Sequence, residues 1–478
     1  MKAQKRMFHH HSHHHDHIRH SVRVDMIHGP LLGPILKFAI PVALGAMLQQ
    51  LFNAVDVAVI GRFDSSEALA AVGSNTSLIS LFVNLFVGIS IGTGVTVARY
   101  FGQGEKKRIP AAVHTSMLLA LIAGVVLMAV VLVVGRSMLQ LMGSPDNVIG
   151  LAVIYLRLYA LGMPFIMIYN FGSAILRSVG DSRRPLYCLI VSGIVNACLN
   201  LFFVIVLEMS VTGVALATVI ANVINAVMIL RFLTTEEEPV RLDLRRLGID
   251  KKELARILRI GVPAGLQGMV FSISNVTIQS SVNSFGADAI AGSAVAFNFD
   301  IFCFYMVTGF VQAAVNFTGQ NYGAGRPKRC RRVFGLCLLA AFSASLLLSL
   351  VFLFGRGFFI GIFTKDAAVI PYAVVRLKRV LTLYCLVSTY EVASASLRGM
   401  GYSMTPSVIT IFGTCVLRIL WVMFVIPHHH SFELLVTVYP VSWIVTGTLM
   451  ILAWFVFSRK AFDRIRTPAG QTEDNASK

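Results

Sequence analysis

An acidic residue in an apolar run is the clearest chemical feature of this sequence. Asp56 lies between Val55 and Val57, in a stretch that continues to Ile60. A carboxylate at the centre of a bilayer costs at least about 2.5–3.5 kcal/mol, so one that persists there usually lines a cavity or a site. Asp56 is therefore a candidate for binding a proton or Na⁺. The alternative is a position near the outer end of a span, where the carboxylate simply reaches interfacial water.

Further polar residues in apolar stretches complete the set of candidates. Glu391 and Asp300 can each contact a cationic ligand or pair with a buried basic residue. Arg157 is costly in a membrane and needs a carboxylate or backbone carbonyls, so we expect it to have such a partner rather than a ligand. Gln49 and Asn170 are uncharged candidates for lining a substrate cavity together with these charged residues.

The composition predicts a membrane protein. The chain is 56% hydrophobic and 13% charged, with a mean hydropathy of +0.74, whereas a soluble domain carries about 25% charged residues. About 12 apolar stretches approach the ~20 residues that a spanning helix needs. We place these spans near residues 34–58, 75–98, 110–134, 150–176, 186–207, 211–233, 259–284, 293–318, 332–354, 368–397, 405–427 and 434–458.

The chain also contains an internal repeat. The pattern Leu-Arg-x-x-Gly-x-Ser-x-x-Pro occurs at 176–185 and again at 397–406. Pro41, which is expected to kink the first span, returns at a similar offset as Pro263 in the seventh. A duplicated membrane half is typical of transporters, in which the substrate path lies at the seam between the halves.

Positive charges are concentrated in alternate loops. The formal net charge is +18, and Lys and Arg cluster in the even-numbered loops and after the last span. Cytoplasmic loops carry this excess, so both termini are predicted to be cytoplasmic. Because each half then starts on the same side, the repeat is predicted to be parallel. The uneven distribution argues against nucleic-acid binding. The clusters lie at 99–108, 177–184, 231–259, 326–332 and 459–466.

These observations divide the chain into five parts. A His-rich cytoplasmic tail covers 1–30, and its tract at 9–17 can bind Zn²⁺ or Ni²⁺ but precedes the predicted fold. The spans form lobes at 31–233 and 259–458. The polar linker 234–258 is expected to include an amphipathic helix on the inner leaflet, and 459–478 is a cytoplasmic tail. The seven cysteines form no CxxC pair, and no metal site is predicted.

Several segments of the chain are informative when they are taken together. They are the paired Leu-Arg-x-x-Gly-x-Ser-x-x-Pro segments, Asn53–Gly61, Ala68–Gly73, Gly102-Gln103-Gly104 and Gln320–Gly325. In this order and spacing they resemble the multidrug and toxic compound extrusion (MATE) transporters, over roughly residues 30–460. The resemblance implies an all-α membrane fold with 12 helices in two six-helix lobes arranged as a V, a central cavity and cation-driven export.

The resemblance assigns a cation site to the first lobe. Asp56 matches the family's aspartate in the first span, and Thr218 matches a threonine in the sixth. In the fifth span the family pattern has Asn and Asp four residues apart, which places both on one helix face; this chain has Asn196 and Asn200. The missing second carboxylate favours proton coupling, although Na⁺ stays open because oxygen ligands suit it. The alternative for both asparagines is hydrogen bonding between helices.

The second lobe departs further from the best-known branch of the family. That branch has a glutamate after the proline of the seventh span, but the segment 263–271 contains no acid. It also has an aspartate in the tenth span, where this chain has Val387 or Ser388. Glu391 and Asp300 are the acids that can take over a role here.

We therefore expect a bacterial inner-membrane antiporter, acting as a monomer among membrane lipids and without a cofactor. It exports an organic cation in exchange for H⁺ or Na⁺ by alternating access. A flippase for a lipid-linked saccharide precursor, as in relatives within the MOP flippase superfamily, is the alternative. An enzyme ranks last, because no catalytic constellation lies in the spans. A flippase needs basic residues in its cavity, and the candidates are Arg157, Arg376, Lys378 and Arg379.

Overall fold

The protein is an all-helical bundle in the part of the chain that is described, residues 23–141 and 146–466 of the computed structural model. Ten of these helices are long and apolar enough to cross a membrane, and up to 12 spans result if each of two bent helix pairs is one span. The predicted all-α membrane fold is confirmed. The His-rich tract at 9–17 and the tail after 466 lie outside the described residues.

The first half of the chain contributes six of these spans. Two of its helices form one bent span, and a π-helical segment at Phe202–Val206 ends the fifth. The helices are α2 (Leu32–Phe63), α3 (Ser66–Gln103), α4 (Ile109–Leu141), α5 (Asp146–Leu161), α6 (Met163–Ser178), α7 (Arg183–Leu201) and α8 (Ser210–Thr234).

The second half repeats this arrangement. A short 3₁₀ turn at Leu244–Arg246 precedes it, and π-helical segments at Ile411–Val416 and Trp421–Val425 interrupt its fifth span. A 3₁₀ turn at Tyr384–Leu386 lies within its bent span. The helices are α9 (Lys251–Asn283), α10 (Ala287–Gly323), α11 (Pro327–Phe354), α12 (Arg356–Phe363), α13 (Ile370–Leu381), α14 (Val387–Gly399), α15 (Met404–Thr410), α16 (Leu417–Leu420) and α17 (Phe432–Arg466).

The fourth span of each half is broken at the same place. The axes of α5 and α6 differ by 46°, and α13 differs by 43° from the helix that follows it. Pro164 lies in the first turn of α6, where its missing N–H leaves no helical bond unmade. Matching breaks in both halves are what a parallel repeat produces.

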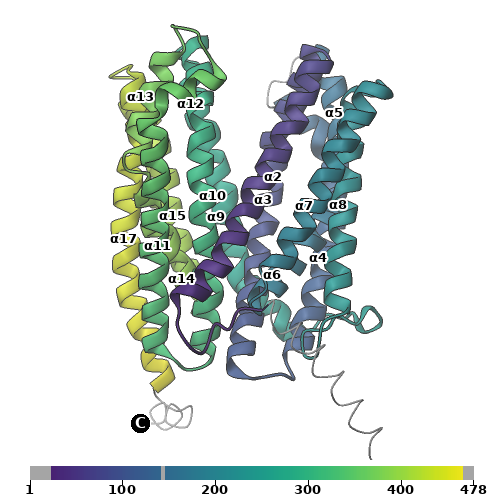
Figure 1. The fold of residues 1–478 in the computed structure, drawn as a ribbon, viewed down its shortest axis with the longest axis vertical. Coiled ribbons are helices and arrows are strands. Elements are labelled where there is room, and N and C mark those ends of the chain that lie inside the picture. The colour runs from purple at the N-terminus through teal and green to yellow at the C-terminus, as the bar shows by residue number, and fades with distance from the viewer. Residues whose placement is uncertain (1–22, 142–145, 467–478) are drawn as a thin grey trace, which may run out of the picture.

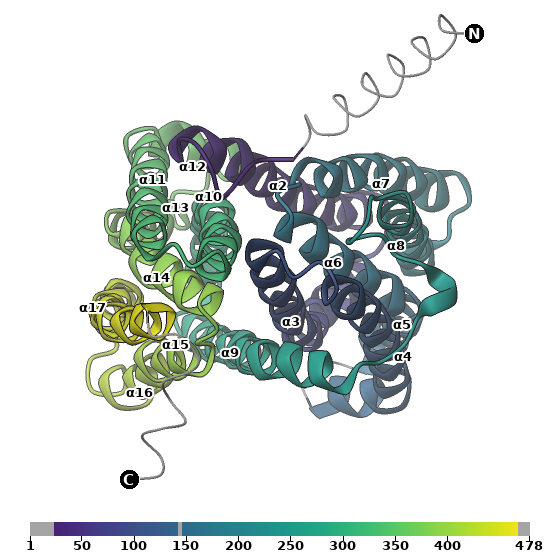
Figure 2. The same cartoon turned by 90° about the horizontal axis from the view of Figure 1, so that it is seen from below.

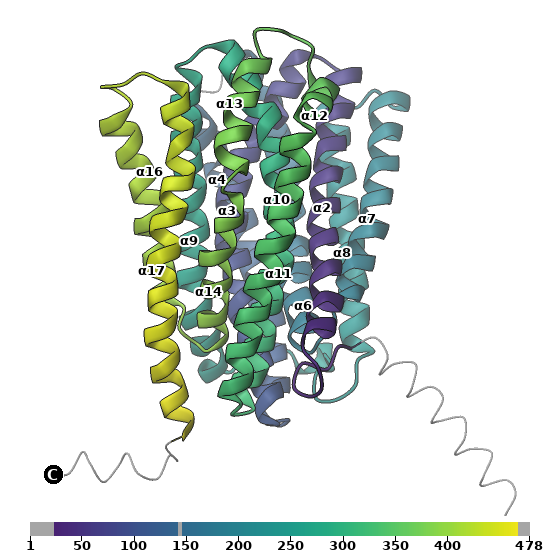
Figure 3. The same cartoon turned by 60° about the vertical axis from the view of Figure 1, so that its left-hand side comes forward.

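The two halves lie side by side and diverge toward one end. Figure 1 shows helices of the first half on one side and of the second half on the other, with the ribbons spreading away from the end where the described chain starts and stops. Seen from below, α9 runs alongside α3 at the junction (Figure 2). Figure 3 shows that α2 and α10 also pass close to each other across the junction.

The closed end of the junction depends on helix backbones that touch. A Cβ atom on Gly88 would lie 2.3 Å from Cα of Gly265, and one on Gly92 would lie 2.2 Å from the carbonyl oxygen of Ile257. Small residues let membrane helices approach closely and pack by van der Waals contact. No larger side chain fits at Gly88 while α3 and α9 stay in place.

We expect Gly88→Val to open this end of the junction, because the added atoms overlap the α9 backbone. Spin labels at Lys106→Cys and Lys328→Cys, exposed positions on opposite halves, report the separation. The labels go into a Cys198→Ser background, since the other six cysteines are buried. Gly73→Val on the same helix is the matched control, because nothing lies within 4 Å of its added Cβ. An unchanged distance distribution for Gly88→Val would show that the junction tolerates a side chain there.

Residues 23–30, which we call the N-terminal strap, bind the first half. The amide of Val24 donates to the carbonyl of Gly180 at 3.0 Å. Arg23 forms an ion pair with Glu236, which also accepts from Arg184 at 2.5 Å. These contacts attach the strap to the loop between α6 and α7 and to the linker after α8.

The same strap binds the second half. Asn321 near the end of α10 donates to the carbonyl of Met26 at 2.9 Å, and Met26 is buried in the core of the second half. Arg329 on α11 donates to the carbonyl of Gly29 at 2.8 Å. The strap therefore joins both halves at the closed end, and a movement that separates them there must break one set of these bonds.

Two predicted features lie at the starts of the first and seventh spans. The helix expected at the end of the linker is the first part of α9, which begins at Lys251 and continues into the seventh span, and its buried Glu253 accepts a hydrogen bond from Tyr100. Pro41 and Pro263 lie inside continuous helices, α2 and α9, and do not divide them. Each proline still removes one backbone hydrogen bond from its helix.

Candidate functional site

The predicted polar residues of the first half come together around Asp56. Asp56 on α2 is buried, with 8% of its surface exposed. The amide of Asn200 donates to its Oδ1, and Oγ1 of Thr218 lies 3.4 Å from its Oδ2. Asn196 donates to Thr218 at 3.4 Å and accepts from Asn200 at 3.3 Å. The four residues, which we call the Asp56 cluster, form one connected network across α2, α7 and α8.

Local sequence explains how these side chains converge. The spacing of four between Asn196 and Asn200 places both on the face of α7 that packs against α2 and α8. Just after Asn200, residues 202–206 adopt π-helical turns. Such turns often occur within helices at functional sites, where they displace the side chains that follow.

The cluster presents more acceptors than donors. The hydroxyl proton of Thr218 has its shorter contact with the carbonyl of Val214, at 2.9 Å, which leaves the Thr218 oxygen facing Asp56 as an acceptor. Oδ1 of Asn200 is buried without a hydrogen-bond partner among the described residues. Carboxylate, hydroxyl and amide oxygens are the ligands that hard cations prefer. The oxygens around Asp56 are therefore of the type that binds Na⁺ or, at the carboxylate, a proton.

In the described part of the chain, no positive side chain compensates the charge of Asp56. Among the described residues, no Lys, Arg or His lies within ion-pair distance of its carboxylate. A buried ionised carboxylate without a partner is strongly unfavourable, so the group gains from taking up a proton or a cation. The alternative that Asp56 only reaches interfacial water does not fit its burial.

Two tyrosines near Asp56 were missed by the sequence analysis. Tyr155 and Tyr159 on α5 are stacked, with ring centroids 6.0 Å apart, and the charge of Asp56 acts on both phenols. Their spacing of four on one helix face is a signal that could have pointed to them. Tyrosines are common in membrane helices, however, and nothing in the sequence connects this pair to Asp56.

In the second half, Asp300 is paired. Nη2 of Arg376 on α13 lies 3.0 Å from Oδ2 of Asp300, and Nη1 donates to Ser293 at 2.7 Å. The guanidinium also lies over the rings of Phe297 and Tyr439, at 5.4 and 5.2 Å. Of the two alternatives for Asp300, the structure therefore contains the pairing with a buried basic residue.

Glu391 on α14 is half-buried and has no ion pair or hydrogen bond with another described residue. The positive charge of Arg398, two turns along, acts on it. Nη2 of Arg398 donates instead to Gln267 on α9, at 2.6 Å. Of the two acids singled out in the second half, Glu391 is therefore the one without an ion pair in the described chain.

The remaining candidates lie outside both acidic sites. Gln49 is exposed on α2, and Asn170 donates to Ile166 in its own helix at 2.8 Å. Arg157 is exposed on α5 and has no hydrogen bond or ion pair with a described residue, so the expected partner is not found. Its counterpart in the repeat, Lys378 on α13, is also exposed.

Comparison with known proteins decides the family. The MatE family model matches residues 41–202 and 263–423, which is once in each half. This chain belongs to the MatE family. The two matches to a single family model also account for the internal repeat.

Relatives of this MatE protein carry names that refer to drugs. The probable multidrug resistance protein YoeA of Bacillus subtilis is 29% identical over 440 residues, covering 90% of this chain and 94% of YoeA. The probable multidrug resistance protein NorM of Thermotoga maritima is 27% identical over 388 residues, covering 79% and 82%. Both alignments extend over most of the two halves.

Solved structures share the fold. A MATE protein crystallised in a bent conformation has a TM-score of 0.83, with 23% identity over 91% of this chain and 97% of its own. A MOP superfamily transporter from Pyrococcus furiosus has a TM-score of 0.84, with 23% identity over 93% and 98%. The V-shaped MATE fold is therefore confirmed for this MatE protein.

Proposed function

We propose that this protein is a secondary active multidrug exporter that exchanges organic cations for H⁺ or Na⁺. The observation that carries the proposal is the buried carboxylate of Asp56, which lies among acceptor oxygens and has no cationic partner in the described chain. The names of its MatE relatives support small-molecule drugs as the substrate class. No resident cofactor is required, because the coupling ion itself supplies the charge.

The exchange follows from two states of the bundle. In the state described, the junction is closed at the end that carries Gly88, Gly265 and the N-terminal strap. The positive-inside pattern supports this end as the cytoplasmic one, so the state is outward-facing. Cation binding at Asp56 favours one state of the bundle, and substrate binding favours the other. Movement of the cation across the membrane in one direction therefore drives movement of the substrate in the other.

Charge distribution favours a cationic substrate over a lipid-linked pyrophosphate. Of the four candidate basic residues for a flippase, Arg376 is neutralised by Asp300 and Arg379 by Glu433, and Arg157 and Lys378 are exposed. Glu391 meanwhile stays without an ion-pair partner among the described residues. A monomer in the bacterial inner membrane, surrounded by lipid and with both termini in the cytoplasm, completes the proposal.

Accumulation of a fluorescent organic cation in inside-out vesicles tests this function. A gradient that drives H⁺ or Na⁺ outward from the vesicle lumen is imposed for each ion separately, at fixed membrane potential. We expect accumulation that starts with the gradient and stops when it is dissipated. If folded protein gives no accumulation with either ion, and across several cationic drugs, the exporter proposal is wrong.

Asn200→Asp is expected to make transport respond more strongly to Na⁺. A second carboxylate beside Asp56 adds an attraction for the cation of up to about 4 kcal/mol for unit charges 4 Å apart at intermediate dielectric, before desolvation. We therefore expect the Na⁺ concentration for half-maximal transport to fall at least about tenfold. Asn298→Asp on α10 is the control, because it makes the same chemical change away from the cluster. An equal response of both variants would mean that Asn200 does not contact the ion.

A further inference from the structure

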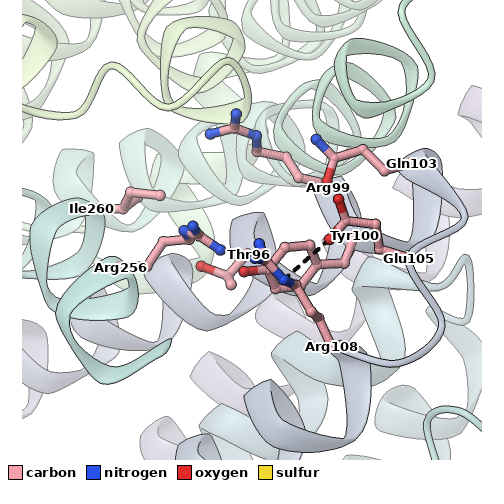
Figure 4. A pocket seen from close by; sticks show the side chains of 8 residues that line it. All are labelled: Thr96, Arg99, Tyr100, Gln103, Glu105, Arg108, Arg256 and Ile260. Atoms are coloured by element: carbon pink, nitrogen blue, oxygen red, sulfur yellow. Dashed lines mark ion pairs between the residues drawn. The ribbon is translucent and has the colours of Figure 1, made fainter. Parts of the chain in front are cut away.

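A small basic pocket lies at the closed end of the junction, away from the Asp56 cluster. Its cavity volume is about 130 Å³. Figure 4 shows Arg99 and Arg108 approaching it from the end of α3 and the loop that follows, and Arg256 approaching from α9. The two halves of the protein thus contribute to one pocket. Neither the Asp56 cluster nor the proposed exchange uses these residues.

The pocket carries unbalanced positive charge. Arg108 is paired with Glu105 at 3.3 Å, and Arg256 with Glu253 at 3.6 Å. Arg99 has no carboxylate within ion-pair distance and donates no hydrogen bond to a described residue. One full positive charge and its N–H groups therefore stay available.

Neighbouring groups hold Arg99 in place. Its guanidinium lies 5.1 Å from the ring centroid of Tyr322, and the space beside Nη1 is closed by Gly401, where a Cβ would approach to 2.7 Å. Both contacts come from the second half. Arg256 in turn lies 5.2 Å from the ring of Tyr100. Arginines fixed in this way lose little side-chain freedom when they bind a ligand.

Size and chemistry together select the ligand class. The cavity is well below the ~300 Å³ at which drug-sized sites begin, but it has room for one tetrahedral anion. The planar N–H fork of arginine matches phosphate oxygens in a bidentate manner. Gln103 lines the same cavity and adds an amide donor. Basic pockets between membrane helices at the cytoplasmic surface are also where acidic lipid headgroups bind.

We propose that this pocket binds a phosphate-bearing anion, either the headgroup of an acidic phospholipid or a soluble phosphate compound. Arg99 of the first half and Arg256 of the second contact the same phosphate group. Because the ligand bridges the two halves, its binding stabilises the closed end of the junction. The state with that end open loses the bridge, so the ligand opposes opening there.

A binding experiment with two arms distinguishes a lipid headgroup from a soluble phosphate compound as the ligand. In the first, the whole protein is placed in phosphatidylcholine nanodiscs with rising fractions of phosphatidylglycerol or cardiolipin, and bound lipid is counted by native mass spectrometry. In the second, inorganic phosphate or pyrophosphate is titrated into the protein in neutral detergent at constant ionic strength, and the melting temperature is followed. Saturable binding in the first arm alone identifies a lipid headgroup, and saturation in the second identifies a soluble anion.

Arg99→Gln with Arg256→Gln is expected to weaken saturable binding at least about tenfold, because two charge-assisted contacts are lost. Arg256→Gln alone, at a partly exposed side chain, is expected to give an intermediate loss and keeps the test valid if the double variant is unstable. Arg245→Gln with Arg459→Gln removes the same charge from exposed positions on the same side. An equal loss in that control, or no saturable binding in either arm, would overturn the proposal.

Discussion

Asp56→Asn is expected to lower gradient-driven accumulation of an organic cation in inside-out vesicles by about 5- to 150-fold, the usual range of coupling between two ligands. The change keeps the shape of the side chain and removes its ability to ionise. Asn200 and Thr218 still have a polar partner, so the helices stay in place. The variant loses the change in conformational equilibrium that cation binding causes in the wild type. Without that change, the cation gradient no longer drives exchange.

Substrate binding measured without a gradient separates a loss of coupling from a loss of folded protein. Under that condition, Asp56→Asn is expected to bind substrate and to stay folded. Asp288→Asn, at an exposed carboxylate in the first turn of α10, is the control and is expected to transport like the wild type. Full gradient-driven accumulation by Asp56→Asn would move the coupling role to another acid, with Glu391 the first to test.

The second large effect is on stability. Asp300→Asn is expected to lower the free energy of unfolding by about 3–5 kcal/mol, because it leaves the buried guanidinium of Arg376 without a counter-charge. Unfolding by SDS in mixed micelles measures the difference. Replacing the pair by Asp300→Leu with Arg376→Met is expected to recover most of the loss, since no buried charge then remains.

An exposed ion pair in the same half serves as the control. Arg379 and Glu433 have side chains that are 51% and 53% exposed, compared with 3% and 8% for Arg376 and Asp300. Glu433→Gln is therefore expected to change stability by only about 0–1 kcal/mol. If Asp300→Asn is as mild as Glu433→Gln, or if the double variant is no more stable than the single one, the pair is not what stabilises this part of the second half.

Much of the first-half site could be predicted because each residue carries its own signal. Asp56 is conspicuous as a carboxylate in an apolar run, and the spacing of Asn196 and Asn200 places them on one face whatever the fold. That they meet Thr218 came from resemblance to a family. The proximity of Tyr155 and Tyr159 to Asp56 was not predictable, because it depends on where α5 lies relative to α2 in the folded bundle.

In the second half and on α5, the partners of charged residues could not be predicted from the sequence. Whether Asp300 would meet a ligand or a basic residue was left open, because the answer depends on the register of α10 against α13. Arg157 was expected to have a protein partner, but it lies exposed on α5. A basic side chain at an exposed position on a membrane helix contacts water or lipid instead of a protein partner. The sequence alone does not show which face of a helix is exposed.

Exchange of substrate for a cation is tested by running the transporter in reverse. Purified protein is reconstituted into sealed liposomes that contain a trapped pH dye or a Na⁺ dye, and an organic-cation gradient is the sole driving force. We expect substrate movement to drive H⁺ or Na⁺ in the opposite direction, and Asp56→Asn to abolish this counter-movement. Substrate movement without any opposing cation flux in the wild-type protein would show that the protein does not exchange substrate for a cation.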